Sequence, residues 1–116
     1  LLFMDFHFNN LAKNTISFLE ENNKDAKVET FDKTIITIGR KGYDVNDVLV
    51  PGGTAISRRH CLIVNSKADV WLYDLGSTGT YLNDVRITSK TPIIGLNKLT
   101  VNNIEYTINT DKNKLL

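Results

Sequence analysis

Apolar and polar residues alternate along most of the chain in short runs, which is the spacing of half-buried β-strands. Ile36 and Ile38 flank a polar threonine, and Ile104, Tyr106 and Ile108 share one face of a later run. Strands are predicted on this basis over residues 16–18, 28–30, 36–38, 61–65, 70–74, 80–82, 98–101 and 104–108.

Turn-forming residues separate these runs. Asn, Asp, Gly and Pro cluster at residues 22–25, 31–33, 51–53, 76–79 and 102–103. Because these breaks lie too close together for long helices, the pattern predicts an all-β sandwich or barrel of many short strands. We expect one domain over residues 14–110, an N-terminal extension or linker of unknown form over 1–13, and a solvated tail over 111–116.

Composition narrows the choice of function. The 116 residues carry 14 Lys and Arg against 13 Asp and Glu, a net charge of +1, so no global field favours nucleic acid or an anionic membrane. Cys61 is the only cysteine, which excludes a disulfide framework and is typical of an intracellular protein. The apolar start has no signal-peptide pattern, and no run reaches the ~20 apolar residues that cross a bilayer.

Residue 1 is Leu rather than Met, so we expect this domain to be one part of a larger protein.

Three polar segments collect the donor groups that suit an oxyanion. They lie at residues 38–47, 57–60 and 74–83, where a sandwich would have loops at one end. A phosphate offers three acceptor oxygens and roughly −1.5 to −2 charge, which calls for guanidinium, hydroxyl and backbone N–H groups together. The candidates are Arg40, Ser57, Arg58 and Thr78, with glycines beside them at 39, 76 and 79.

The order and spacing of these segments resemble the signature of the forkhead-associated (FHA) domain family. Gly39-Arg40 follows a strand, Ser57-Arg58-Arg59-His60 comes next, and the run from Asp74 to Asn83 closes the pattern. The resemblance covers about residues 14–109. It implies a β-sandwich of two sheets and about eleven short strands, ligand loops at one end, and binding of phosphothreonine peptides without catalysis or cofactor.

The resemblance also implies roles for single residues. Arg40 matches the arginine that pairs with the phosphate, and Ser57 matches the serine whose hydroxyl bonds a phosphate oxygen. Arg58 matches a further donor position, and Thr78 or Ser77 matches the threonine of the later loop. Residues 41–44 and 52–56 correspond to variable loops that would meet the flanking residues of the peptide and set partner choice.

Four further residues are expected to shape the site without touching the ligand. His60 matches a histidine that braces the loops, and Asn83 matches an asparagine that bonds loop backbone. Gly39 and Gly79 would serve backbone shape.

One departure from the family pattern concerns the later loop. The family commonly reads Ser-Thr-Asn-Gly-Thr, whereas Ser77-Thr78-Gly79-Thr80 lacks the asparagine. Either the loop is one residue shorter, or Ser77 takes the place of the threonine and Thr78 that of the asparagine.

Other functions fit the sequence less well. Ser57, His60 and Asp74 could be a hydrolase triad, but no Gly-x-Ser-x-Gly elbow is present. Two adjacent arginines are too few for a duplex footprint, and two lone histidines give no metal-site spacing. The main alternative is an FHA scaffold that binds a partner protein without phosphate.

Overall fold

The computed structural model describes residues 14–110, which form eleven strands and one short 3₁₀ turn. The elements are β1 (Ile16–Glu20), β2 (Glu29–Phe31), β3 (Ile35–Arg40), β4 (Val48–Val50), η1 (Gly53–Ala55), β5 (Cys61–Asn65), β6 (Val70–Asp74), β7 (Thr80–Leu82), β8 (Val85–Arg86), β9 (Thr91–Pro92), β10 (Leu96–Val101) and β11 (Ile104–Thr110). The expected extension over 1–13 and tail over 111–116 lie outside the described residues.

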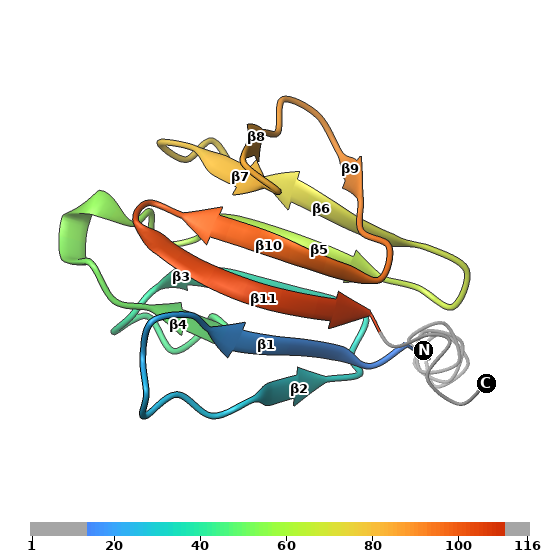
Figure 1. Ribbon diagram of the computed structural model, residues 1–116. Helices are drawn as coiled ribbons and strands as arrows, with labels where there is room; N and C mark the ends of the chain where they lie inside the picture. Colours follow the sequence, from blue (N-terminus) through green and yellow to red (C-terminus); the bar gives the residue numbers. More distant parts are fainter. Residues whose placement is uncertain (1–13, 111–116) are drawn as a thin grey trace.

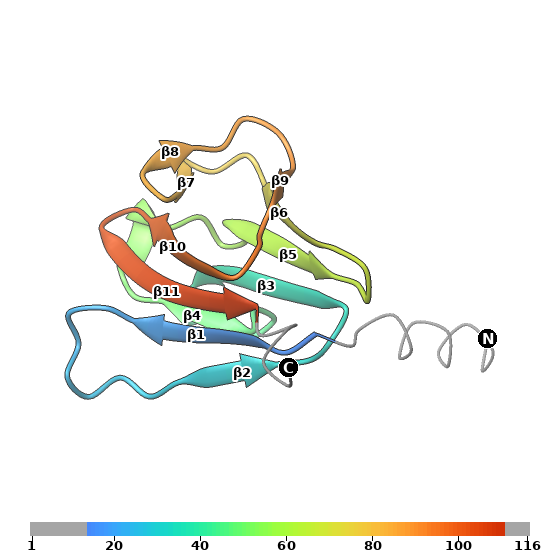
Figure 2. The same cartoon turned by 45° about the vertical axis from the view of Figure 1, so that its right-hand side comes forward.

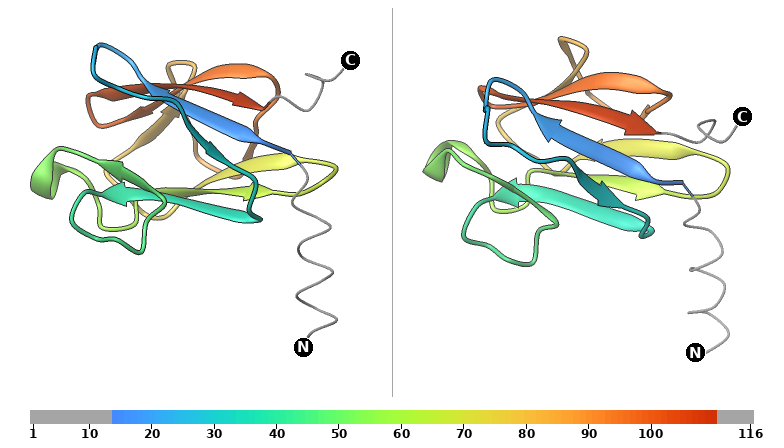
Figure 3. Two further views of the ribbon diagram at one scale, coloured as in Figure 1. Left: turned by 90° about the horizontal axis from the view of Figure 1, so that it is seen from below. Right: turned by 60° about the horizontal axis from the view of Figure 1, so that its bottom comes forward.

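The strands pair into two sheets that lie face to face (Figures 1 and 3). One sheet has six strands in the order β2-β1-β11-β10-β7-β8, and the other has five in the order β4-β3-β5-β6-β9. Neighbouring strands in both sheets are antiparallel, except that β4 is parallel to β3. The predicted all-β sandwich of two sheets is therefore confirmed.

The core lies between the sheets and follows the alternation of the sequence. Phe18, Ile36, Ile38 and Leu72 are at most 1% exposed, and each is followed or preceded by a less buried neighbour on its strand. Phe18 packs edge-on against Phe31 and Tyr106, with ring centroids 5.7 and 6.4 Å apart. Burial of these faces is the main stabilisation of the fold.

The sequence pattern missed the shortest strands. β8 and β9 have two residues each, too few for an alternation to be visible, and the three residues of β4 are all apolar, so they show no alternation with polar residues. The turn predicted over residues 31–33 begins one residue too early, because Phe31 is the last residue of β2 and pairs with Ile16. Within residues 14–110 the structure has no helix long and apolar enough to span a membrane.

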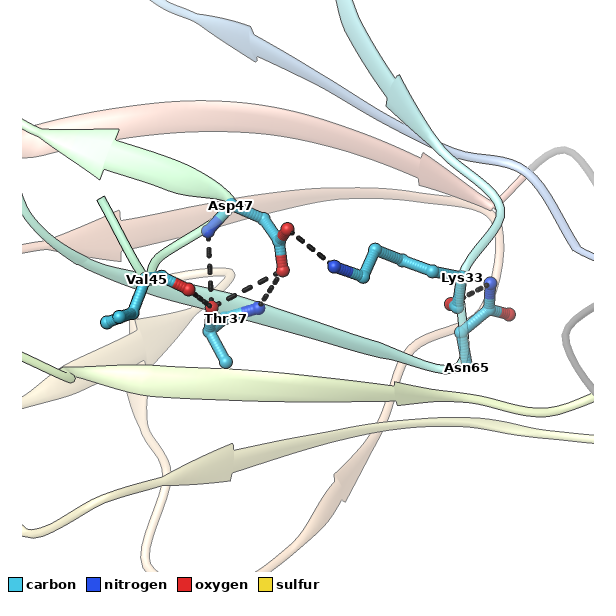
Figure 4. A network of polar contacts seen from close by, with 5 residues as sticks. All are labelled: Lys33, Thr37, Val45, Asp47 and Asn65. Atoms are coloured by element: carbon cyan, nitrogen blue, oxygen red, sulfur yellow. Dashed lines mark hydrogen bonds and ion pairs between the residues drawn. The ribbon is translucent and has the colours of Figure 1, made fainter. Parts of the chain in front are cut away.

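Side-chain hydrogen bonds join the residues just before β4 to β3, with which β4 pairs in parallel (Figure 4). The carboxylate of Asp47 accepts from the backbone N–H of Thr37 at 2.9 Å and forms an ion pair with Lys33 at 2.8 Å. The hydroxyl of Thr37 donates to the carbonyl of Val45 at 3.2 Å. These bonds fix the end of the segment that joins the two strands, residues 41–47, which we call loop 41–47.

Candidate functional site

Three connections gather at one end of the sandwich. Loop 41–47 joins β3 to β4, loop 51–60 joins β4 to β5 and contains η1, and loop 75–79 joins β6 to β7. Figure 1 shows η1, the end of β3 and the β10–β11 turn at the same end of the molecule. The structure thus brings together the three polar segments that are far apart in the sequence.

Arg40 is the last residue of β3 and is bonded to loop 51–60 at two points. Its backbone N–H donates to the carbonyl of Ser57 at 3.1 Å, and its Nε donates to the carbonyl of Ile56 at 2.8 Å. Ile56 is itself fully buried, so it fixes that carbonyl in space. Because Nε is occupied by the protein, the terminal Nη groups are the donors of Arg40 left for a ligand.

Tyr43 lies between the two arginines of the candidate site. The guanidinium carbons of Arg40 and Arg58 are each 5.4 Å from the centroid of the Tyr43 ring. This distance is within the range of cation–π attraction, which orients both side chains. Within residues 14–110, neither arginine forms an ion pair with a carboxylate. The two charges are therefore available to an anion.

Gly39 is required by a close approach of two backbones. A Cβ atom on Gly39 would lie 2.1 Å from the carbonyl oxygen of Arg58 and 2.7 Å from the side-chain nitrogen of Asn46. No side chain fits at that distance. The glycine therefore allows the end of β3 to lie against loop 51–60.

Asn46 is a residue whose role the sequence did not reveal. It is 5% exposed, and its side-chain nitrogen donates to the carbonyls of Arg58 at 2.7 Å and Tyr43 at 3.1 Å. One amide thus joins loop 41–47 to loop 51–60. The signal that could have found it is a polar residue between apolar Val45 and Val48, but that pattern is also typical of a solvent-facing turn.

His60 connects loop 51–60 to loop 75–79 through both of its ring nitrogens. Nδ1 accepts from the backbone N–H of Ser57 at 3.3 Å, so in the neutral ring the proton is on Nε2, which donates to the carbonyl of Gly79 at 2.8 Å. The side chain is fully buried. The Ser57 hydroxyl has no hydrogen-bond partner among residues 14–110 and remains free to donate.

Asp74 organises loop 75–79 from the end of β6. One carboxylate oxygen accepts the backbone N–H groups of Gly76 and Ser77 at 3.2 and 3.3 Å, and the other accepts the hydroxyls of Ser77 and Thr80. Partial burial alone would raise the pKa of Asp74, but these hydrogen bonds to the charged form lower it below its ordinary value. Asp74 is thus an ionised anchor for the loop.

Ser77 and Thr78 have different surroundings in this loop. The Ser77 hydroxyl donates to Asp74 and accepts the N–H of Gly79 at 3.0 Å, so it is directed into the loop. Thr78 is exposed, and its side chain makes no hydrogen bond within the described residues. Of the two expected hydroxyls, that of Thr78 is the one open to a ligand.

Asn83 holds a different part of the molecule from the one expected. It lies in the β7–β8 turn with φ at 52°, where its side-chain oxygen accepts the N–H of Lys98 at 2.9 Å and its nitrogen donates to Asn97 at 2.8 Å. It therefore fixes β10 against the turn, and not loop 75–79. An asparagine is favoured at this position because it tolerates a positive φ.

The described residues form neither the hydrolase triad nor a metal site. Both nitrogens of His60 are used by backbone groups, and Asp74 bonds Ser77 and Thr80, so Ser57, His60 and Asp74 form no triad. Among residues 14–110, no three His, Cys, Asp or Glu side chains lie together as a metal site. Cys61 is buried in the core, and this burial raises the pKa of its thiol to about 12, so it is no nucleophile.

Known structures have the same fold. Mycobacterium tuberculosis EmbR in complex with a low-affinity phosphopeptide aligns with a TM-score of 0.74 and 18% identity over 93% of this chain, which spans 28% of the EmbR chain. The N-terminal FHA domain of Saccharomyces cerevisiae Rad53p, bound to a phosphothreonine peptide, aligns with a TM-score of 0.71 and 17% identity over 87% of this chain and 98% of the other.

A third similar structure is the FHA domain of a Chlamydia trachomatis protein, with a TM-score of 0.71 and 16% identity over 83% of this chain and 96% of the other. A search with the sequence found no match among curated proteins. The family model described as FHA domain matches residues 36–102, from β3 to the β10–β11 turn, and so includes all three loops. This chain therefore belongs to the FHA domain family.

Proposed function

We propose that this domain binds a phosphorylated threonine of a partner protein where loops 41–47, 51–60 and 75–79 meet. The observation that carries the proposal is the state of Arg40. Its Nε is fixed by the Ile56 carbonyl, it stacks on Tyr43, and no carboxylate within residues 14–110 neutralises it. A cation positioned in this way, without a counterion, suits a dianionic ligand.

The surrounding groups complete a cage for the phosphate. The Nη groups of Arg40 would form charge-assisted bonds to phosphate oxygens, and the Ser57 hydroxyl would donate to a third. Arg58 and the exposed hydroxyl of Thr78 would approach from the two flanking loops, while Ser77 would contribute mainly through loop shape. Each bond to a charged group contributes about 1.5–3 kcal/mol, so a few of them supply most of the ~8 kcal/mol of a micromolar complex.

His60, Gly39 and Gly79 would act by positioning these donors. The buried ring of His60 keeps Ser57 at a fixed place relative to Gly79, and Gly39 lets Arg40 reach loop 51–60. Since a preformed cage loses little entropy when the ligand binds, these residues would raise affinity without touching the phosphate. Asn83 would support the fold of β10 and stand outside this set.

The activity proposed is binding and not catalysis. The site offers hydrogen-bond donors and positive charge, and its buried histidine has both nitrogens engaged with backbone. An intracellular location stays a prediction that depends on the single cysteine.

A second candidate, a scaffold that binds its partner without phosphate, is favoured by the outer face of the five-stranded sheet. Ile35, Val64, Trp71 and Pro92 lie side by side in the register of β3, β5, β6 and β9, on the side away from the core. Ile35 is 49% exposed. Such an apolar row can serve as a protein contact.

The test is a titration of the chain against a degenerate phosphothreonine peptide library, the same library with phosphoserine, and an unphosphorylated copy. The proposal predicts binding to the first, weaker binding to the second because the family implies a contact with the threonine methyl group, and none to the third. Equal binding to the phosphorylated and unphosphorylated libraries, or none to any, would instead support the phosphate-independent scaffold.

A further inference from the structure

A groove of about 560 Å³ lies beside the candidate site and takes no part in the cage described above. It is lined by Tyr73 and Asp74 at the end of β6, by Arg86 at the end of β8 and by residues 87–90 of the β8–β9 connection. Figure 2 shows this connection arching beside β6. The groove is large enough for a side chain of a bound peptide.

The groove is continuous with loop 75–79. Asp74 lines the groove and also anchors that loop through Ser77 and Thr80. On the other wall, the Nε of Arg86 lies 3.7 Å from the position that a Cβ of Gly79 would take. A peptide whose phosphate is held by loops 51–60 and 75–79 could therefore extend into the groove without leaving the surface.

The groove carries net positive charge, because its lining has two basic residues and one acidic residue. Arg86 and Lys90 are both exposed, and neither forms an ion pair within residues 14–110. The Nζ of Lys90 lies 4.5 Å from the centroid of the Trp71 ring, a cation–π contact that holds the ammonium group along β6.

Asp74 is the one acidic residue of the lining, and it forms no ion pair with Arg86 or Lys90. Both of its oxygens already accept hydrogen bonds from loop 75–79, and those bonds keep it ionised and directed toward the loop. Arg86 and Lys90 therefore line the groove without an ion-pair partner in residues 14–110. Thr88 and Ser89 add polar groups between them.

We propose that this groove is a second subsite, which takes an acidic side chain, Asp or Glu, of the same phosphopeptide and so helps to select the partner. The proposal rests on the proposed function, because the phosphate brings the peptide to this end of the molecule. Arg86 and Lys90 have no ion-pair partner among the described residues, so they complement a carboxylate. Their charge would also steer acidic partners during the encounter. The proposed subsite gives the β8–β9 connection a part in selecting the partner, a role that the sequence alone assigned to residues 41–44 and 52–56.

The experiment uses alanine-based phosphothreonine peptides that each carry a single glutamate at a different position beside the phosphothreonine. Affinities are measured for the wild type, for the double variant R86Q/K90Q, and for Lys67→Gln. Lys67 is the matched control because it is an exposed lysine of the β5–β6 turn and does not line the groove. A second series with lysine in place of glutamate tests the sign of the charge.

For the wild type and Lys67→Gln, glutamate at one position should raise the affinity about two- to fivefold over alanine, and lysine there should lower it. The gain should disappear in the double variant, which should still bind the all-alanine phosphopeptide, and it should shrink at high salt. A glutamate gain at no position, or one that persists in the double variant, overturns the subsite but not the phosphate site. If no peptide binds in a phosphate-dependent way, the proposed function fails and the subsite with it.

Discussion

Loop 51–60 and loop 75–79 meet at the His60–Gly79 hydrogen bond, but they hold their shapes in different ways. Loop 51–60 is fixed by residues outside the loop: Arg40 and Asn46 donate hydrogen bonds to its carbonyls, and Gly39 lets β3 lie against it. Loop 75–79 is wound around Asp74, which immediately precedes it. The first loop therefore depends on residues distant in sequence, and the second depends on its own local pattern of side chains.

The difference bears on what each loop can contribute to binding. Loop 51–60 brings its Ser57 hydroxyl and Arg58 to a place fixed by the core, through buried Ile56 and His60. In loop 75–79, the Ser77 hydroxyl forms hydrogen bonds with the Asp74 carboxylate and with the N–H of Gly79, whereas Thr78 is exposed. We therefore expect phosphate affinity to depend more on loop 51–60 and its braces than on the side chains of loop 75–79.

The largest expected effect is that of Arg40→Ala on phosphopeptide affinity. Loss of the positive charge and of the Nε hydrogen bond to the Ile56 carbonyl should weaken binding by about 2–4 kcal/mol, roughly thirty- to a thousandfold, in a domain that still folds. Calorimetric titration measures the loss. Arg59→Ala is the matched control, because Arg59 is exposed and has no partner among the described residues, and it should bind like the wild type. A folded Arg40→Ala domain of unchanged affinity would remove Arg40 from the site.

Gly39→Ala should have the largest effect on stability. The new Cβ would collide with the Arg58 carbonyl, so the backbone of β3 or loop 51–60 must shift, and the free energy of unfolding should fall by about 3 kcal/mol. Urea denaturation measures the change. Gly53→Ala is the comparison, since its Cβ meets no atom within 4 Å and its φ of 59° alone should cost about 1 kcal/mol. Equal losses would mean that the close approach does not constrain the fold.

His60→Ala tests the link between the two loops. It should lower the free energy of unfolding by about 2–3 kcal/mol, because it leaves a cavity and leaves the buried Gly79 carbonyl and the partly buried Ser57 N–H without partners. It should also weaken phosphopeptide binding, since Ser57 would lose its fixed position. Thermal melting and titration of the same sample measure both effects. A variant that melts like the wild type would show that the loops hold together without the histidine.

Asp74→Ala should have a smaller effect, confined to loop 75–79. Loss of the anchor should cost about 1–2 kcal/mol of stability at neutral pH. Because the folded pKa of Asp74 lies below its ordinary value of 3.8, the carboxylate stabilises the fold above that pH, and this contribution is lost as the pH falls through the folded pKa. The difference between wild type and variant should therefore be present at neutral pH and shrink in acid. A pH-independent difference in urea midpoint would contradict this role.

The sequence predicted the fold well because the sandwich depends on the alternation that the chain displays. The longer strands, such as β5, β6 and β11, lie close to the predicted runs, since each buries one face. β8 and β9 were missed because two residues show no period, although their connection carries the proposed acidic-residue subsite. Short strands at a sheet edge are fixed by their partners and not by their own pattern.

For the candidate site, sequence reasoning identified the residues better than their contacts. It named Arg40, Ser57 and His60 through the family pattern, but not Asn46, whose bonds join two loops across 12 residues of sequence. It expected Asn83 to bond loop backbone near the site, whereas the side chain bonds β10. Hydrogen bonds between distant segments depend on how the sheets pack, which a single sequence does not display.

The measurement that tests the central claim most directly is an NMR titration of the ¹⁵N-labelled domain with a phosphothreonine peptide and its unphosphorylated copy. We predict that the Nε–H of Arg40 and the backbone N–H groups of Ser57, Arg58 and Thr78 shift with the phosphorylated peptide alone, while Lys67 in the β5–β6 turn does not. Shifts confined to the outer face of the five-stranded sheet, or equal for both peptides, would contradict a phosphate site where the three loops meet.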